Sequence, residues 1–145
     1  MALKVELKPG ERFILGTAVI TNGGQRSRLY IEGDIPILRE KDILTPETAD
    51  TPAKRIYLAV QVMYLDGETQ SRHDIYFELV NDVVRAAPST LPYVDRINNQ
   101  ILTGFLYKAL REAKALIEYE EELLEHAKFG GAAVRQHSPE NEQPA

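Results

Sequence analysis

The stretch TPETADTPAKRIYLAVQVMYLD, residues 45–66, is where the sequence changes from strand-like to helix-like patterning. Thr51 suits a helix N-cap, and Pro52 suits the first helical position because proline lacks an N–H group that would stay unpaired there. These signals predict a helix that runs to about Leu65. Its apolar residues lie on nearly every side, which predicts burial between other elements or against a second subunit. They are Ile56, Leu58, Val60, Val62, Met63 and Leu65.

The residues before this stretch predict a small antiparallel β-unit at 1–45, because apolar and polar side chains alternate over short runs. The first run is ALKVELK, residues 2–8, and the second is RFILGTAVIT, residues 12–21, with Gly16 as a bulge or corner. NGG at 22–24 predicts a tight hairpin turn, since such turns need positive φ. RSRLYIEG, residues 26–33, then alternates again.

The residues after this stretch predict two more helices and a tail. One helix fits residues 69–85, and a long third helix begins at Ser89 or Thr90 and runs to about Ala127. We therefore expect an α+β fold: the β-unit, a helical part at 46–128 that packs on it or forms a dimer, and a disordered tail at 129–145.

Composition excludes several classes of protein. The chain has 145 residues and no cysteine, which excludes a disulfide framework, thiolate catalysis and zinc–thiolate sites. No basic region followed by an apolar stretch opens the sequence, and no apolar run approaches the length that spans a membrane. We expect a soluble cytoplasmic protein of one domain, without a membrane partner.

The net charge of −5 is unevenly distributed. Residues 1–60 hold nine Lys/Arg and eight Asp/Glu, whereas residues 61–145 hold eight and fourteen. Such an asymmetry is typical of a basic binding end joined to an acidic partner end, but it also occurs without functional meaning. Both interpretations stay open on charge alone.

The sequence offers no catalytic set. The only histidines are 73, 126 and 137, and no glycine-rich loop precedes a helix to hold phosphates. His73–Asp74 reads as a surface pair, and the glutamates between 118 and 125 read as a solvated face rather than as metal ligands. We expect a protein that is not an enzyme and that has no metal or cofactor.

Basic residues in the β-unit and at the first helix are the candidates for a binding site. The alternation places Arg26, Arg28 and Tyr30 on the outer face of one strand, where guanidinium and phenol groups could hold unstacked RNA bases. An ordinary soluble β-surface is the alternative. Lys54 and Arg55 lie in a first helical turn, where the helix dipole favours anions, so they fit an anion site or solvated cations on long stems.

The chain also resembles a known family. LKPGERFILG (7–16), ILREKDIL (37–44) and TPAKRIYLAVQVMYL (51–65) are similar to the FlbT family of flagellar-biosynthesis repressors, and the resemblance covers residues 3–127. It implies a post-transcriptional regulator that associates with the 5′ untranslated region of flagellin mRNA and promotes its decay. Some members look like activators instead. The small flagellar regulator FlaF is implied as a partner.

A shorter resemblance links residues 10–40 to the carbon storage regulator CsrA, a small β-dimer that grips mRNA leaders. The arginine that is central to RNA contact in CsrA falls on Arg39, in RLYIEGDIPILRE, residues 28–40. The other arginine of that site is replaced here by Leu7, with Lys8 beside it.

These observations predict an RNA-binding surface. Its candidate residues are Lys8, Arg12, Arg26, Arg28, Tyr30, Arg39, Lys54 and Arg55. The alternative is an adaptor or chaperone-like regulator that binds flagellin or FlaF through its helices, without touching RNA. The apolar first helix also leaves a homodimer open.

Overall fold

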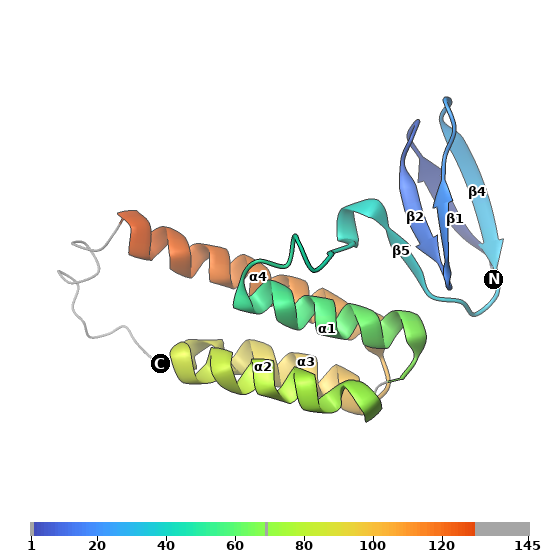
Figure 1. Ribbon diagram of the computed structural model, residues 1–145. Coiled ribbons are helices and arrows are strands. Elements are labelled where there is room, and N and C mark those ends of the chain that lie inside the picture. The colour runs from blue at the N-terminus through green and yellow to red at the C-terminus, as the bar shows by residue number, and fades with distance from the viewer. Residues whose placement is uncertain (1, 69, 130–145) are drawn as a thin grey trace. The chain divides into compact units, whose positions relative to one another are not determined.

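The computed structural model describes residues 2–68 and 70–129 (Figure 1). Within these ranges the chain forms two compact units: a β-unit of residues up to 43 with 65–67, and a helical unit of residues 44–64 with those from 68 onward. The α+β class and the N-terminal antiparallel strands are confirmed. The predicted disordered tail, apart from Phe129, lies outside the described residues.

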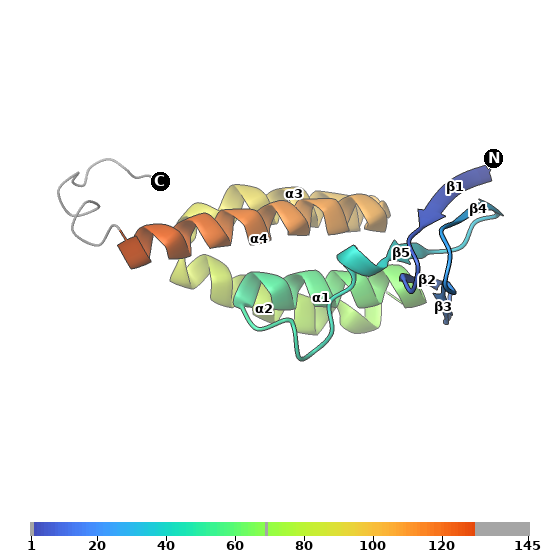
Figure 2. The ribbon, with the colours of Figure 1, turned by 90° about the horizontal axis from the view of Figure 1, so that it is seen from above.

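The β-unit holds five strands in two antiparallel sheets (Figures 1 and 2). Strand β1 (Ala2–Leu7) pairs with β4 (Ser27–Glu32), and a three-stranded sheet has the order β3 (Ala18–Thr21), β2 (Arg12–Leu15), β5 (Ile37–Arg39). A short 3₁₀-helix, Glu40–Asp42, follows β5.

Both sheets share one hydrophobic core. Val5, Leu7 and Phe13 are its buried centre, and partly buried residues from both sheets pack against them. These are Leu15, Ile20, Leu29, Ile31 and Ile37. Since successive residues of a strand point to opposite faces, the other face of the β1–β4 sheet is an outer face.

The turns of the β-unit differ from the prediction. RFILGTAVIT is not one strand: Gly16, at φ 64°, turns the chain so that β2 and β3 form a hairpin. The predicted hairpin at 22–24 is wrong, because β3 and β4 belong to different sheets. The Asn22 side-chain amide donates to the carbonyls of Leu7 (3.3 Å), Lys8 (2.7 Å) and Gln25 (2.7 Å). Asn22 therefore holds the crossing between the sheets.

Among its described residues the helical unit contains four α-helices. They run side by side in both views (Figures 1 and 2). They are α1 (Pro52–Asp66), α2 (His73–Ala86), α3 (Leu91–Leu102) and α4 (Leu106–Phe129), with 3₁₀-turns Gln70–Arg72 before α2 and Pro88–Thr90 before α3. Each helix gives an apolar stripe to the interior, as amphipathic helices do. The largest fully buried side chains there are Tyr76, Ile56, Met63, Ile97, Leu116, Val60 and Val94.

The single long third helix of the prediction is wrong, because the chain forms α3 and α4 with a turn between them. Gly104 takes φ 85°, and its N–H donates to the carbonyl of Ile101 at 3.1 Å, while the Phe105 N–H donates to the carbonyl of Gln100 at 2.8 Å. These two bonds are the glycine-centred helix stop of the Schellman type. The helices then pack on each other, and the rings of Tyr93 and Tyr119 stack at 4.6 Å.

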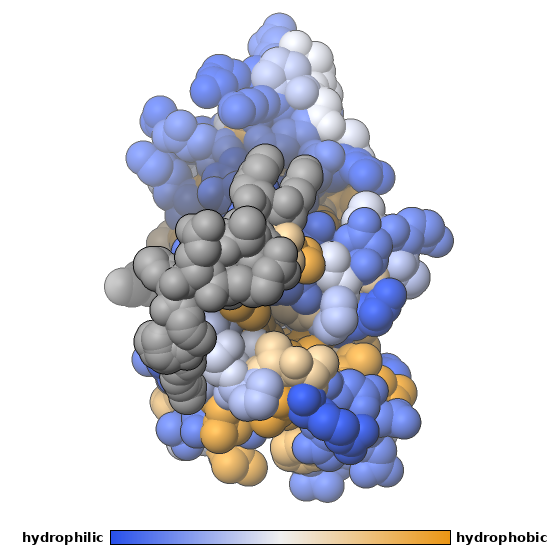
Figure 3. All heavy atoms as spheres, turned by 90° about the vertical axis from the view of Figure 1, so that its left-hand side faces the viewer, coloured by the Kyte–Doolittle hydropathy of each residue, from blue (hydrophilic) through white to orange (hydrophobic). Residues whose placement is uncertain are grey.

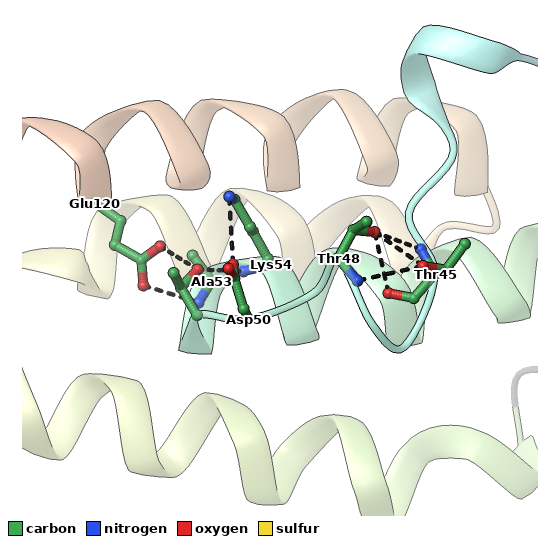
Figure 4. Close-up of polar contacts among 7 residues, drawn as sticks. Thr45, Thr48, Asp50, Ala53, Lys54 and Glu120 are labelled. Carbon is green, nitrogen blue, oxygen red and sulfur yellow. Dashed lines mark hydrogen bonds and ion pairs between the residues drawn. The ribbon is translucent and has the colours of Figure 1, made fainter.

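The start of α1 is held by a carboxylate from α4. Thr51 caps the helix as predicted, since its hydroxyl accepts from the Lys54 N–H at 3.2 Å. Glu120 accepts from the Ala53 N–H at 3.0 Å and from the Thr51 hydroxyl at 2.5 Å (Figure 4). The interpretation of residues 118–125 as a solvated face is therefore wrong for Glu120, which satisfies unpaired donors at a helix N-terminus.

The sign of the change in unfolding free energy caused by Gly104→Ala distinguishes a turn from a continuous helix. In a continuous helix alanine would stabilise by about 1 kcal/mol over glycine. At φ 85° we expect it to destabilise by about 1 kcal/mol instead, and Gly104→Asn to cost less, because asparagine tolerates left-handed backbone. Urea denaturation followed by circular dichroism measures both. A stabilised alanine variant would contradict the turn.

Substituting Glu120→Gln tests the carboxylate at α1. We expect a loss of about 1–2 kcal/mol in the free energy of unfolding, as for other helix N-terminal acceptors. The matched control is Glu121→Gln, an exposed neighbour on the same helix, which should change stability by less than about 0.5 kcal/mol. Equal effects of the two substitutions in urea denaturation would rule out the special role of Glu120.

Candidate nucleic-acid interface

The outer face of the β1–β4 sheet gathers charged and aromatic side chains from both strands. In the register, Lys4 lies opposite Tyr30 and Glu6 opposite Arg28, and Glu32 ends the row. Directly opposite residues share a face. All five side chains are exposed, and Tyr30 is 64% exposed. The alternation along β4 confirms that Arg28 and Tyr30 share this face, which we call the outer face from here on.

The charges on the outer face are balanced by weak ion pairs. A Glu6 carboxylate oxygen lies 3.6 Å from both the Lys4 ammonium and the Arg28 guanidinium, and all three side chains are more than half exposed. Exposed pairs of this kind contribute about 0–1 kcal/mol. Both cations can therefore exchange Glu6 for a phosphate at little cost, beside a ring on which a base can stack.

Lys4 was missed as a candidate by sequence reasoning. The alternation of β1 put Lys4 and Glu6 on one face, but only the antiparallel pairing with β4 places Lys4 next to Tyr30. The pairing of the first and fourth strands was the missing information.

Lys8 and Arg26 adjoin the outer face at one end. Leu7 and Ser27 are register partners, so Lys8 leaves the sheet at the same end at which Arg26 enters it. Both side chains are exposed. Because the outer face carries two cations and two carboxylates, these two predicted residues are what make the surface basic at this end.

Arg12 and Arg39 do not lie on the outer face, because both belong to the three-stranded sheet. Arg12 is exposed on the opposite side of β2 from Phe13, and its backbone N–H donates to Glu40 at 2.8 Å. Arg39 lies opposite Phe13 in the register and so on the core side of that sheet.

The Arg39 side chain joins the two sheets. Its Nη2 donates to the Glu6 carbonyl at 2.6 Å and to the Glu11 carboxylate at 2.9 Å, and 37% of the side chain stays exposed. One hydrogen bond reaches β1 and the other reaches the turn between β1 and β2. Arg39 is thus a structural link, and its contact with RNA stays a prediction.

This arrangement favours the ionised form of the Glu11 side chain over the protonated form. The Lys8 N–H donates to its Oε1 at 2.9 Å, and the Arg39 guanidinium binds its other oxygen. These two hydrogen bonds, in that order of effect, hold the pKa of Glu11 below its ordinary value.

Lys54 and Arg55 belong to the helical unit. Lys54 lies 3.5 Å from Asp50 (Figure 4), and Arg55 is exposed. The backbone donors that suggested an anion site are used within the chain: the Ala53 N–H donates to Glu120, and the N–H groups of Lys54 and Arg55 donate to Thr51. An external anion would have to displace that carboxylate or bind the two cations alone.

The described residues show two further absences. No group of three or more histidine, aspartate or glutamate side chains among them is placed to hold a metal ion. None of the helices in this part of the chain is long and apolar enough to cross a membrane.

The Glu11–Arg39 contact predicts a pH effect. Because the pKa of Glu11 is lowered on folding, the carboxylate stabilises the β-unit above pH 4.5 and loses this contribution as the pH falls through the lowered pKa. Glu11→Gln should therefore destabilise at pH 7, and its effect should shrink as the pH falls below 4.5 and through the lowered pKa of Glu11. Glu32→Gln, at an exposed glutamate, is the control. An NMR titration in which the Glu11 pKa is unchanged by Arg39→Ala would contradict the assignment.

No solved structure matches this chain. The resemblance of the β-unit to CsrA therefore stays a prediction. The structure does place Leu7, which replaces the first arginine of the CsrA site, in the buried core of the unit.

Sequence comparisons assign the chain to a family. The model of "Flagellar protein FlbT" matches residues 3–124. A probable flagellum biosynthesis repressor protein FlbT 1 of Bradyrhizobium diazoefficiens is 61% identical over 124 residues, covering 85% of each chain. The flagellum biosynthesis repressor protein FlbT of Caulobacter vibrioides is 39% identical over 137 residues, covering 92% of this chain and 96% of the relative. The chain thus belongs to the FlbT family of flagellar proteins.

Proposed function

We propose that this protein represses flagellum biosynthesis after transcription, by binding the 5′ untranslated region of flagellin mRNA and promoting its degradation. The repressor role is supported by the names of its relatives. The observation that carries the RNA contact is the outer face, where Lys4, Arg28 and Tyr30 are exposed side by side.

The chemistry of the outer face suits a single-stranded leader. A guanidinium and an ammonium can each bind a phosphate, and a phenol ring can stack on any unpaired base. The acidic residues of the helical unit disfavour polyanions, so binding would be confined to the β-unit. A leader held single-stranded is also open to ribonucleases, which connects binding to decay.

The alternative is an adaptor that binds flagellin or FlaF through the helical unit. Its support is a hollow of about 440 Å³ at the turn between α3 and α4, lined by Tyr64, Gly104, Phe105, Leu106, Tyr107 and Lys108. Leu102 beside it is 75% exposed. Figure 3 also shows apolar surface low on the face that it draws, at the level of α2 and α3. The exposed large apolar side chains of the helical unit include Ile75, Phe77 and Leu91. Exposed apolar surface of this kind suits a protein partner.

Binding to a labelled flagellin leader RNA, measured against salt concentration, tests the proposal. Arg28→Gln and Lys4→Gln should each weaken binding several-fold and lower the salt slope by about one, as expected for one lost phosphate contact. Glu6→Gln should strengthen binding, because it removes the carboxylate that competes with phosphate for both cations.

The matched control is Arg85→Gln on α2, an exposed arginine of the helical unit that pairs with Asp82. It should leave RNA affinity unchanged. If the folded wild-type protein binds no leader RNA at low salt, the proposal fails and the adaptor reading is favoured. If Arg85→Gln weakens binding as much as Arg28→Gln, the contact is not on the outer face.

A further inference from the structure

Strand β4 has an open edge. It pairs with β1 on one side, and within the described residues no strand pairs with the other side and no other backbone hydrogen bond reaches Ser27–Glu32 (Figure 1). Along this edge of a six-residue strand, alternate residues present unpaired N–H and C=O groups, which are a template for another strand. A two-stranded sheet is also short of the three or more strands that are usual for stability.

The edge of β1 is less available. Its carbonyl groups near the end of the strand accept side-chain donors, from Arg39 at Glu6 and from Asn22 at Leu7. These contacts occupy backbone acceptors at this end of β1. A further strand is therefore expected to pair with the open edge of β4 and not with the edge of β1.

The sequence of β4 is complementary to itself in one register. If two β4 strands pair antiparallel with Tyr30 on the twofold axis, Arg28 lies opposite Glu32 of the second copy, and Leu29 lies opposite Ile31. The charged pairs and the two tyrosines fall on the outer face, and the apolar pairs fall on the core side. Opposite charges and aromatic pairs directly across strands are favourable.

Neighbouring registers lose this match. Centred on Leu29, the pairing puts Ser27 opposite Ile31 and Arg28 opposite Tyr30. Centred on Ile31, it puts Leu29 opposite Gly33 and Tyr30 opposite Glu32. Moving the centre by one residue shifts the register by two and keeps the faces matched. A register shift of only one residue would place the core-side residues of one strand opposite the outer-face residues of the other. Of these registers, only the Tyr30-centred one gives an opposite-charge pair on the outer face within the strand Ser27–Glu32 itself, together with a Leu29–Ile31 pair on the core side.

We propose that a second copy of this chain binds along β4, so that the two β1–β4 sheets become one four-stranded sheet with the order β1-β4-β4-β1. The interface joins two outer faces across the twofold axis. It also extends the apolar layer beside Ile31, whose register partner Leu3 is 49% exposed on the core side. This inference concerns assembly and does not depend on RNA binding.

Disulfide trapping tests the register directly, since the chain has no cysteine of its own. Tyr30→Cys places two thiols opposite each other at the axis, with their Cβ atoms about 4.5–5.5 Å apart, close to the roughly 3.5–4.5 Å that a disulfide spans. We expect rapid oxidation to a covalent dimer at micromolar protein. Lys4→Cys, on the same face but on β1, is the matched control and should oxidise far more slowly. Equal oxidation rates of the two variants would overturn the proposal.

A charge exchange gives a second, reversible readout by analytical ultracentrifugation. Arg28→Glu and Glu32→Arg should each weaken dimerisation at least about tenfold, because each puts like charges opposite across the axis, and the double variant should restore it. Arg12→Glu, which carries the same charge change on the other sheet, should leave the dimer unchanged. Circular dichroism checks that each variant is folded. A wild-type protein that stays monomeric at hundreds of micromolar, or single variants that dimerise like the wild type, would overturn the proposal.

Discussion

The hydrogen bonds of Arg39 tie together the two sheets on which the β-unit depends. A two-stranded sheet is at best marginally stable alone. The shared core of Val5, Leu7 and Phe13 needs both sheets to stay in place, and Arg39 links β5 to β1 and to the following turn at its margin. That arrangement turns Lys4, Arg28 and Tyr30 outward.

The helical unit also uses a charged side chain for an internal contact. Glu120 gives both carboxylate oxygens to the start of α1, so the most anion-attracting point of that helix is used within the chain. Two of the strongest-looking anion sites in the sequence, Arg39 and the first turn of α1, are thus internal contacts. The surface left for a ligand is the weakly paired outer face, where an exchange of partners costs little.

The proposed RNA contact and the proposed dimer contact would both use strand β4. Alternate residues of β4 face outward, where RNA is proposed to bind, while the backbone edge is free to pair with a second copy. The backbone edge points perpendicular to the outer face, but Arg28 and Tyr30 take part in both proposed contacts, because they lie beside the twofold axis as well as on the RNA-binding face. A paired edge would set two basic surfaces at a fixed spacing, which favours a longer or repeated RNA target through multivalency.

The sequence by itself determined the periodic features: the α+β class, the start of α1 at Thr51 and Pro52, and the alternation that exposes Arg28 and Tyr30. These depend on neighbours within a few residues. The helix stop at Gly104 is local as well, since its hydrogen bonds join residues 100–105, although the apolar pattern around it predicted a continuous helix. The tertiary structure alone decided which strands pair and that Arg39 and Glu120 bond within the chain. Those outcomes depend on partners up to 69 positions away, and local propensity carries no information about such distant contacts.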